Sequence, residues 1–240
     1  MEQKKFSILK WITAAVFAVL IIWQGVGAVK EILHLIQMME GNTVATIINI
    51  CTKLLSNTSL LVGFGLILAA ALLRRPRLLA VIGCIVVALS YLPGMFGNST
   101  KLITLLRDIE RYYNPYYQQI LSSFLTTGLS TAVYLAAFLF AAVVILLPGK
   151  VAKIASVVPA LLIVCKIPVV FVGVILYVNA LADKFVIPFR EALTNQGHLN
   201  TLVLATGLVL LCLVAANAPR KSRKKAANAQ SLPEETTAEA

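Results

Sequence analysis

The sequence predicts an all-α integral membrane protein of six transmembrane helices, with both termini in the cytoplasm. Composition is the first observation behind this prediction. Hydrophobic residues make up 59% of the 240 positions and charged residues 13%, whereas about 25% of the residues in soluble domains are charged. The mean hydropathy of +0.87 is more than the core of a soluble fold can take up. The other two observations are the length of the apolar runs and the placement of the basic residues between them.

Short basic clusters separate the apolar runs. A charge at the centre of a bilayer costs at least about 2.5 kcal/mol, so these clusters must lie in water or among lipid headgroups. Thirteen of the 21 basic residues fall in four of them: Lys4, Lys5 and Lys10; Arg74, Arg75 and Arg77; Lys150 and Lys153; and Arg220, Lys221, Arg223, Lys224 and Lys225. With both termini inside, the inner segments hold 13 basic and four acidic residues, and the outer segments hold seven and six. Because basic residues mark cytoplasmic loops, we expect the two internal clusters to set the topology.

Six apolar runs are long enough to cross the hydrocarbon core at 1.5 Å per residue. They cover about 11–29, 54–73, 78–96, 127–147, 154–178 and 199–216. Together they form a transmembrane domain over residues 1–218. The first run could instead belong to a cleaved signal peptide, because Val26-Gly27-Ala28 would suit signal peptidase. Its apolar part is longer than is usual for a signal peptide, and its loss would leave five spans, so we expect it to be retained.

The segments between the spans differ on the two sides of the membrane. After the first span, apolar residues recur at helical spacing up to a predicted break at Gly41-Asn42. This pattern predicts a helix that either continues out of the membrane or lies along its surface. Residues 97–125 form a second outer segment with an apolar stripe, and residues 179–199 form a third. The tail, 219–240, is basic and then acidic, and it has too little apolar content to fold, so we expect a disordered cytoplasmic tail.

The inner turns carry prolines at a nearly constant spacing. Pro76, Pro148 and Pro219 are 72 and 71 residues apart. This spacing is consistent with three tandem two-helix repeats, which could close into a bundle with approximate threefold symmetry. The alternative is that any six-span protein with short inner loops looks roughly periodic.

Lys166 is the one charged residue inside a predicted span. It lies 13 residues beyond Lys153, about 20 Å along a helix. Pro168 follows two residues later and leaves a carbonyl near Val164 without its usual backbone partner. Because no predicted span contains an acidic residue, Lys166 either loses its charge, faces a hydrated cavity or attracts an anion. An ionisable group at this depth indicates a functional site; the alternative is a lysine that snorkels along a bent helix.

Polar or helix-breaking residues occur at a similar depth in each odd-numbered span. Counted from the preceding basic residue, Gln24 is 14 residues into its span, Pro93 is 16, Lys166 is 13 and Pro168 is 15. If the bundle is symmetric, these four residues converge at one level, where transporters place substrate sites. Alternatively they are isolated residues of kinds that are common in spans and need not meet.

Four tyrosines flank Pro115 in the second outer segment: Tyr112, Tyr113, Tyr116 and Tyr117. They could form an aromatic cage for a cation. The alternative is that they belong to the belt of aromatic residues found at membrane interfaces.

Several classes of function have no support in the sequence. We found no nucleophile elbow, metalloprotease motif or phosphate-binding loop, and the two histidines and four cysteines are scattered. We therefore expect neither an enzyme nor a protein with a metal or other cofactor. Nucleic-acid binding is not expected either, because no basic domain lies outside the spans.

Two functions remain after these exclusions. The first is a small permease-like or substrate-binding component of a transport system. The second is an accessory, assembly or sensory subunit that does not transport and that acts through protein contacts. In either case the lipid bilayer is the immediate partner, and a partner subunit or a homo-oligomer is possible. The compact loops are typical of a multi-pass protein of a cell membrane, most simply the bacterial cytoplasmic membrane.

Overall fold

The computed structural model describes residues 2–37, 43–73, 76–111, 115–181 and 196–218. Within these ranges the chain is almost entirely helical and contains no strand. Six helical stretches are long and apolar enough to cross a membrane: Phe6–Gln37, Ile50–Leu72, Arg77–Phe96, Tyr116–Leu146, Gly149–Ile175 and Leu199–Asn217. The predicted class, an all-α multi-pass membrane protein with six spans, is thereby confirmed.

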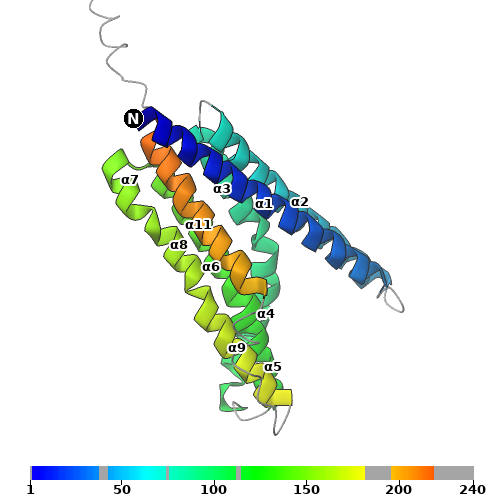
Figure 1. Cartoon of the computed structure of the whole chain (residues 1–240). Coiled ribbons are helices and arrows are strands. Elements are labelled where there is room, and N and C mark those ends of the chain that lie inside the picture. The colour runs from blue at the N-terminus through cyan, green and yellow to red at the C-terminus, as the bar shows by residue number, and fades with distance from the viewer. Residues whose placement is uncertain (1, 38–42, 74–75, 112–114, 182–195, 219–240) are drawn as a thin grey trace, which may run out of the picture.

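The first half of the chain forms two spans in one long hairpin and a third span that is interrupted near its end (Figure 1). Its helices are α1 (Glu2–Gln37), α2 (Thr43–Leu72), α3 (Pro76–Ser90) and α4 (Leu92–Arg107), followed by a short 3-10 turn, Ile109–Arg111. Helix α1 continues without a break beyond the first predicted span and ends at Gln37. The predicted continuing helix is therefore present as far as this residue, and its position relative to the membrane stays a prediction. The predicted break at Gly41-Asn42 lies outside the described residues.

The second half contains the remaining three spans. The fourth span combines α5 (Pro115–Ser123), a π-helical turn (Phe124–Leu129) and α6 (Ser130–Leu146). The fifth combines α7 (Gly149–Ala155), α8 (Val157–Val164) and α9 (Lys166–Leu181), and the sixth is α11 (Gln196–Asn217). Residues 182–195, and the tail for which disorder is predicted, fall outside the described ranges.

Proline residues divide the third and fifth spans into shorter helices. A proline inside a helix removes one backbone donor, and its ring clashes with the carbonyl four residues earlier. Helix α3 ends at Ser90, three residues before Pro93. Helices α7 and α8 each end four residues before a proline, Pro159 and Pro168 respectively. Each interruption therefore has a proline within one turn on its C-terminal side.

Consecutive spans pack side by side, and the last span closes against the first. Helix α3 packs on α2 and on α6, helix α8 packs on α6 and on α11, and α11 also contacts α1. Helix α11 additionally touches α2 and α3, so it is the most enclosed span, with half of its apolar window buried. The six spans are therefore not equivalent in their surroundings, and the threefold repeat stays a prediction.

The core of the bundle combines aliphatic side chains with small and aromatic ones. Phe64 of α2 lies between Phe17 of α1 and Phe138 of α6, with ring centroids 5.9 and 6.2 Å apart. Beside this aromatic group, α2 and α3 approach closely through Gly63 and Gly83. Small residues at such a contact allow two helix backbones to pack directly, which is the usual basis of helix association in lipid.

The basic turns lie together at one end of the bundle, called the basic end below (Figure 1). Arg77 donates hydrogen bonds to the carbonyls of Ala215 and Ala218 at the end of α11, at 3.0 and 3.2 Å. Lys10 reaches the carbonyl of Leu73 at 3.4 Å. Toward the opposite end, the α1–α2 hairpin diverges from α4, α5 and α9 (Figure 1).

Candidate functional site

A polar cavity of about 320 Å³ lies within the bundle, and all six spans contribute to its wall. This cavity is called the central cavity below. It is lined by Leu20, Gln24, Glu31, Lys53, Ser56, Asn57, Leu60, Phe64, Ser90, Tyr91, Tyr134, Lys166, Asn200 and Leu204. Since a water molecule occupies about 30 Å³ in the liquid, the space suits a solute of several heavy atoms.

Lys166 is held in the central cavity by a tyrosine of the neighbouring span. Its ammonium donates a 2.7 Å hydrogen bond to the hydroxyl oxygen of Tyr134 and lies 4.4 Å from the centroid of the same ring. The hydroxyl of Tyr134 is 3.4 Å from the hydroxyl oxygen of Thr201 on α11. The ring stacks on Tyr91, with centroids 5.2 Å apart. These contacts fix both the ring and the hydroxyl group that receives the ammonium.

The positive charge of Lys166 is stabilised here without a carboxylate. An ammonium has three N–H donors, and Tyr134 takes one of them. No described acidic residue forms an ion pair with Lys166. A hydrogen bond and a cation–π contact lower the free energy of the charge, but they leave it uncompensated. The site therefore retains both positive charge and donors for a ligand.

The interruption before Pro168 explains why Lys166 occupies this position. Helix α8 ends at Val164 and α9 begins at Lys166, so the lysine stands at the junction of two helices. The carbonyl freed by Pro168, near Val164, is one acceptor within the same span. The bond observed instead runs across to Tyr134 on the adjacent span.

Amide and hydroxyl groups line the cavity between Lys166 and the opposite end. The amide nitrogen of Gln24 is 3.5 Å from the side-chain oxygen of Asn57, at the long limit for a hydrogen bond. The amide nitrogen of Asn57 is buried and has no partner among the described residues. Ser56 donates a 2.7 Å hydrogen bond to the carbonyl of Ser90 and thereby links α2 to α3.

Glu31 and Lys53 form an ion pair between α1 and α2 on the side of the cavity farthest from the basic end. Their charged atoms are 2.6 Å apart, and about half of each side chain is exposed. Exposed pairs of this kind contribute at most about 1 kcal/mol to stability. The pair therefore contributes mainly by neutralising both charges locally.

A second cavity, of about 420 Å³, adjoins the central one and is called the outer cavity below. It lies between α2 and α4, and its lining residues are Thr52, Lys53, Ser56, Pro93, Gly94, Asn98 and Lys101. Lys53 and Ser56 line both cavities and so stand between them. The ammonium of Lys101 donates a 2.8 Å hydrogen bond to the hydroxyl of Ser123.

Two of the four residues predicted to converge line the same cavity. Gln24 and Lys166 line the central cavity, and Pro93 lines the outer one. Pro168 is exposed on α9 and lines neither cavity. Residues two positions apart on a helix point to nearly opposite sides, so Pro168 and Lys166 could not share a face.

The structure describes two of the four tyrosines of the predicted aromatic cage, so the cage stays a prediction. Tyr116 is 67% exposed, whereas Tyr117 is only 7% exposed and its hydroxyl donates to the carbonyl of Leu105 at 3.2 Å. Adjacent helical residues differ by about 100° in direction, which separates the two rings. Tyr112 and Tyr113 lie outside the described residues.

The residues predicted to set topology differ in their contacts. Arg77 bonds to the end of α11, whereas Lys150 and Lys153 are exposed at the basic end. Arg74 and Arg75 lie outside the described residues. Their role in orientation stays a prediction.

Sequence reasoning missed several polar residues of the central cavity. Tyr91, Tyr134 and Asn57 fall within predicted spans, and Asn200 lies at the start of the last one. The available signal was that each of these spans carries a hydroxyl or amide side chain amid apolar residues. The predicted site rested only on a charged residue, a glutamine and two prolines.

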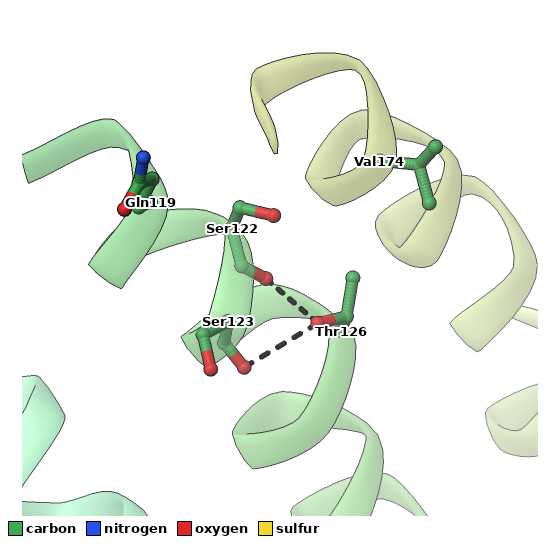
Figure 2. A pocket seen from close by; sticks show the side chains of 5 residues that line it. All are labelled: Gln119, Ser122, Ser123, Thr126 and Val174. Atoms are coloured by element: carbon green, nitrogen blue, oxygen red, sulfur yellow. Dashed lines mark hydrogen bonds between the residues drawn. The ribbon is translucent and has the colours of Figure 1, made fainter. Parts of the chain in front are cut away.

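A third, shallower pocket of about 290 Å³ lies beside the π-helical turn, between α5 and α9 (Figure 2). The hydroxyl of Thr126 bonds to the carbonyls of Ser122 and Ser123 at 2.8 and 3.4 Å, and Ser122 donates to the carbonyl of Gly173. The hydroxyl groups of Ser122 and Thr126 therefore bond to backbone carbonyls, and the bond from Ser122 to Gly173 joins α5 to α9. Their hydrogen-bonding capacity is used structurally, which distinguishes this pocket from the central cavity.

Metal-binding side chains do not cluster in the described parts of the chain: no group of three or more His, Cys, Asp or Glu residues could hold an ion there. Comparison of the chain with known protein families, curated proteins and solved structures gave no match. The residues of the two cavities are therefore the basis for any assignment of function.

Proposed function

We propose that the protein is a membrane-embedded, permease-like component that binds a small polar solute in the central cavity. The observation that carries the proposal is the uncompensated charge of Lys166 in a polar cavity within the spans. Ionisable residues at this depth are costly, and in membrane proteins they mark substrate or ion pathways. Side chains from six spans meet around this lysine, an arrangement expected of a binding site rather than of a snorkelling side chain.

Orientation and location form part of the same proposal. The basic end faces the cytoplasm by the positive-inside rule, with both termini there, and the two cavities then open toward the outside. The membrane is the bacterial cytoplasmic membrane, which suits the compact basic turns. The three two-helix units, if they are true repeats, arose by duplication of an outward and a returning span.

A thermal-shift screen with the full-length protein in neutral detergent tests solute binding. Sodium salts, sugars, amino acids and quaternary ammonium salts are compared at constant ionic strength. We expect at least one class of solute to raise the Tm of the wild type, because a ligand that binds only the folded state stabilises it. The variant Lys166→Leu should insert normally and lose this response.

Lys30→Gln provides the control for the loss of a positive charge. Lys30 is exposed near the end of the first span and lines neither cavity, so its removal should leave the response unchanged. The proposal fails if no solute raises the Tm of the wild type, or if Lys166→Leu responds as the wild type does.

A partner-binding accessory or sensory subunit is the second candidate. Helix α1 has 36 residues, about 54 Å at 1.5 Å per residue, against a hydrocarbon core of about 30 Å. Leu33 and Ile36, in the part of α1 beyond the first predicted span, are about half exposed. These apolar side chains favour contact with another subunit. A partner that still copurifies with Lys166→Leu, when no solute binds the wild type, would favour this second function.

A further inference from the structure

The two adjoining cavities carry an excess of positive charge among their described lining residues. Three lysines and one glutamate line them. Lys53 and Glu31 neutralise each other at 2.6 Å. Lys101 in the outer cavity and Lys166 in the central cavity bond only to hydroxyl groups in the contacts described above. Among the described residues, each cavity therefore holds one ammonium group that no carboxylate neutralises.

The central cavity also offers more hydrogen-bond donors than its own acceptors use. Lys166 has two N–H groups beyond the one that Tyr134 accepts. The buried amide nitrogen of Asn57 has no acceptor, and the bond from Gln24 to Asn57 is at the limit of length. A buried donor without an acceptor carries an uncompensated desolvation cost. A ligand that supplies acceptor oxygens would remove this cost, whereas a cation would bring more donors and more positive charge.

Size and apolar contacts narrow the class of anion. The central cavity, at about 320 Å³, is far larger than a halide needs. Phe64, Leu20, Leu60 and Leu204 form part of its lining beside the polar groups. A phosphate or sulfate ion has no apolar part to place against them, but the carbon skeleton of a small organic acid does.

We propose that the solute is a small organic carboxylate, and this inference rests on the proposed solute-binding function. Its carboxylate accepts hydrogen bonds from Lys166 and Asn57, and its carbon skeleton packs against the apolar part of the cavity. Lys101 lies along the approach and raises the local concentration of anions, because positive charge in a cleft attracts and steers them.

Matched pairs of probes separate charge from shape. Sodium butyrate is compared with butyramide, and sodium benzoate with benzamide, by titration calorimetry on the full-length protein in neutral-lipid nanodiscs. Each pair differs chiefly in the carboxylate. We expect each carboxylate to bind at least about tenfold more tightly than its amide, which is the range of a hydrogen bond to a charged group. Sodium phosphate and sodium chloride are run at equal ionic strength to test for simple anion binding.

Three variants test the assigned contacts. Lys166→Gln should weaken butyrate binding about tenfold or more, whereas Lys166→Arg, which keeps the charge, should retain part of the affinity. Asn57→Asp, which leaves Lys166 intact, should also weaken it because the new carboxylate repels the ligand. Lys30→Gln, the matched control, should bind butyrate as the wild type does.

The outcomes distinguish this inference from the proposed function. If butyramide binds as tightly as butyrate, or if a neutral or cationic solute binds in a manner that requires Lys166, the carboxylate assignment is wrong and solute binding stands. If phosphate or chloride binds as tightly as butyrate, the site is a general anion site and the carboxylate assignment is also wrong. If none of the solutes used here or in the thermal-shift screen binds, both proposals fail.

Discussion

The phenol oxygen of Tyr134 distinguishes Lys166 from a lysine that merely snorkels. A snorkelling side chain extends its ammonium toward the nearest interface. The ammonium of Lys166 instead bonds to a side chain of the adjacent span, whose ring is fixed by Tyr91 and whose hydroxyl lies near Thr201. Because the partner is a neutral hydroxyl group rather than a carboxylate, the lysine is oriented while its charge remains available.

Tyr134→Phe removes this hydroxyl and keeps the ring. We expect the free energy of unfolding to fall by about 1–2 kcal/mol, because a half-buried ammonium loses a hydrogen bond. Binding of butyrate should weaken, though less than in Lys166→Gln, because the charge remains. Both quantities can be measured by chemical denaturation and titration calorimetry in detergent.

Tyr117→Phe is the matched control for that variant. It deletes the same atom from a buried tyrosine that bonds to the carbonyl of Leu105, away from the cavities. It should lower stability to a similar degree and leave butyrate binding unchanged. Equal binding by Tyr134→Phe and the wild type would show that the hydroxyl does not position Lys166.

Among the elements, the contact between α2 and α3 depends on glycine because the backbones meet directly. A Cβ atom placed on Gly83 would lie 2.7 Å from a side-chain carbon of Ile67 and 2.9 Å from the carbonyl oxygen of Gly63. The second of these atoms belongs to backbone and cannot move aside as a side chain can. The same packing places Ser56 against the carbonyl of Ser90 and so fixes one wall of the central cavity.

Gly83→Ala should therefore destabilise the protein, although alanine is the better helix former. We expect a loss of about 1–3 kcal/mol, typical of overpacking a close contact, measured as a lower Tm in detergent. Gly65→Ala on α2 is the control: a Cβ atom there meets nothing within 4 Å, so the change should be neutral or stabilising. A Gly83→Ala protein as stable as Gly65→Ala would contradict the close approach of the two helices.

For the molecule as a whole, the proposed orientation makes the two ends of the bundle chemically distinct. The basic end gathers the N-terminus, the two internal basic turns and the end of α11 (Figure 1). The opposite end carries the diverging helices and the ion pair of Glu31 with Lys53. If the basic end faces the cytoplasm, a reagent that cannot cross the membrane should reach only the opposite end from outside.

Cysteine labelling in intact cells and in inverted vesicles tests this expectation. Single cysteines replace Val151 in the second basic turn, Ser222 in the tail and His34 near the end of α1, after the four native cysteines are changed to serine. We expect Val151→Cys and Ser222→Cys to react only in inverted vesicles, and His34→Cys only in intact cells. Labelling of Val151→Cys and Ser222→Cys on opposite faces would overturn the proposed topology.

The extent to which the sequence predicts this molecule follows from the range of each interaction. The six spans depend on local hydropathy and local charge, so they could be predicted from runs of residues. The shared depth of Gln24 and Lys166 could also be predicted, because it depends only on distance along a helix from a basic residue. The stacking of Tyr91 on Tyr134 depends on how α3 and α6 face each other, which no local pattern determines. The same holds for the pairing of Glu31 with Lys53, which joins two helices.

The bonds from Arg77 to the carbonyls of Ala215 and Ala218 have a consequence for biosynthesis. Arg77 is synthesised early in translation, but its acceptors leave the ribosome some 140 residues later. Until α11 has been synthesised, neither this contact nor the packing of α1 against α11 can form. A ribosome stalled before Leu199 would leave an open, five-helix intermediate that quality-control proteases can recognise.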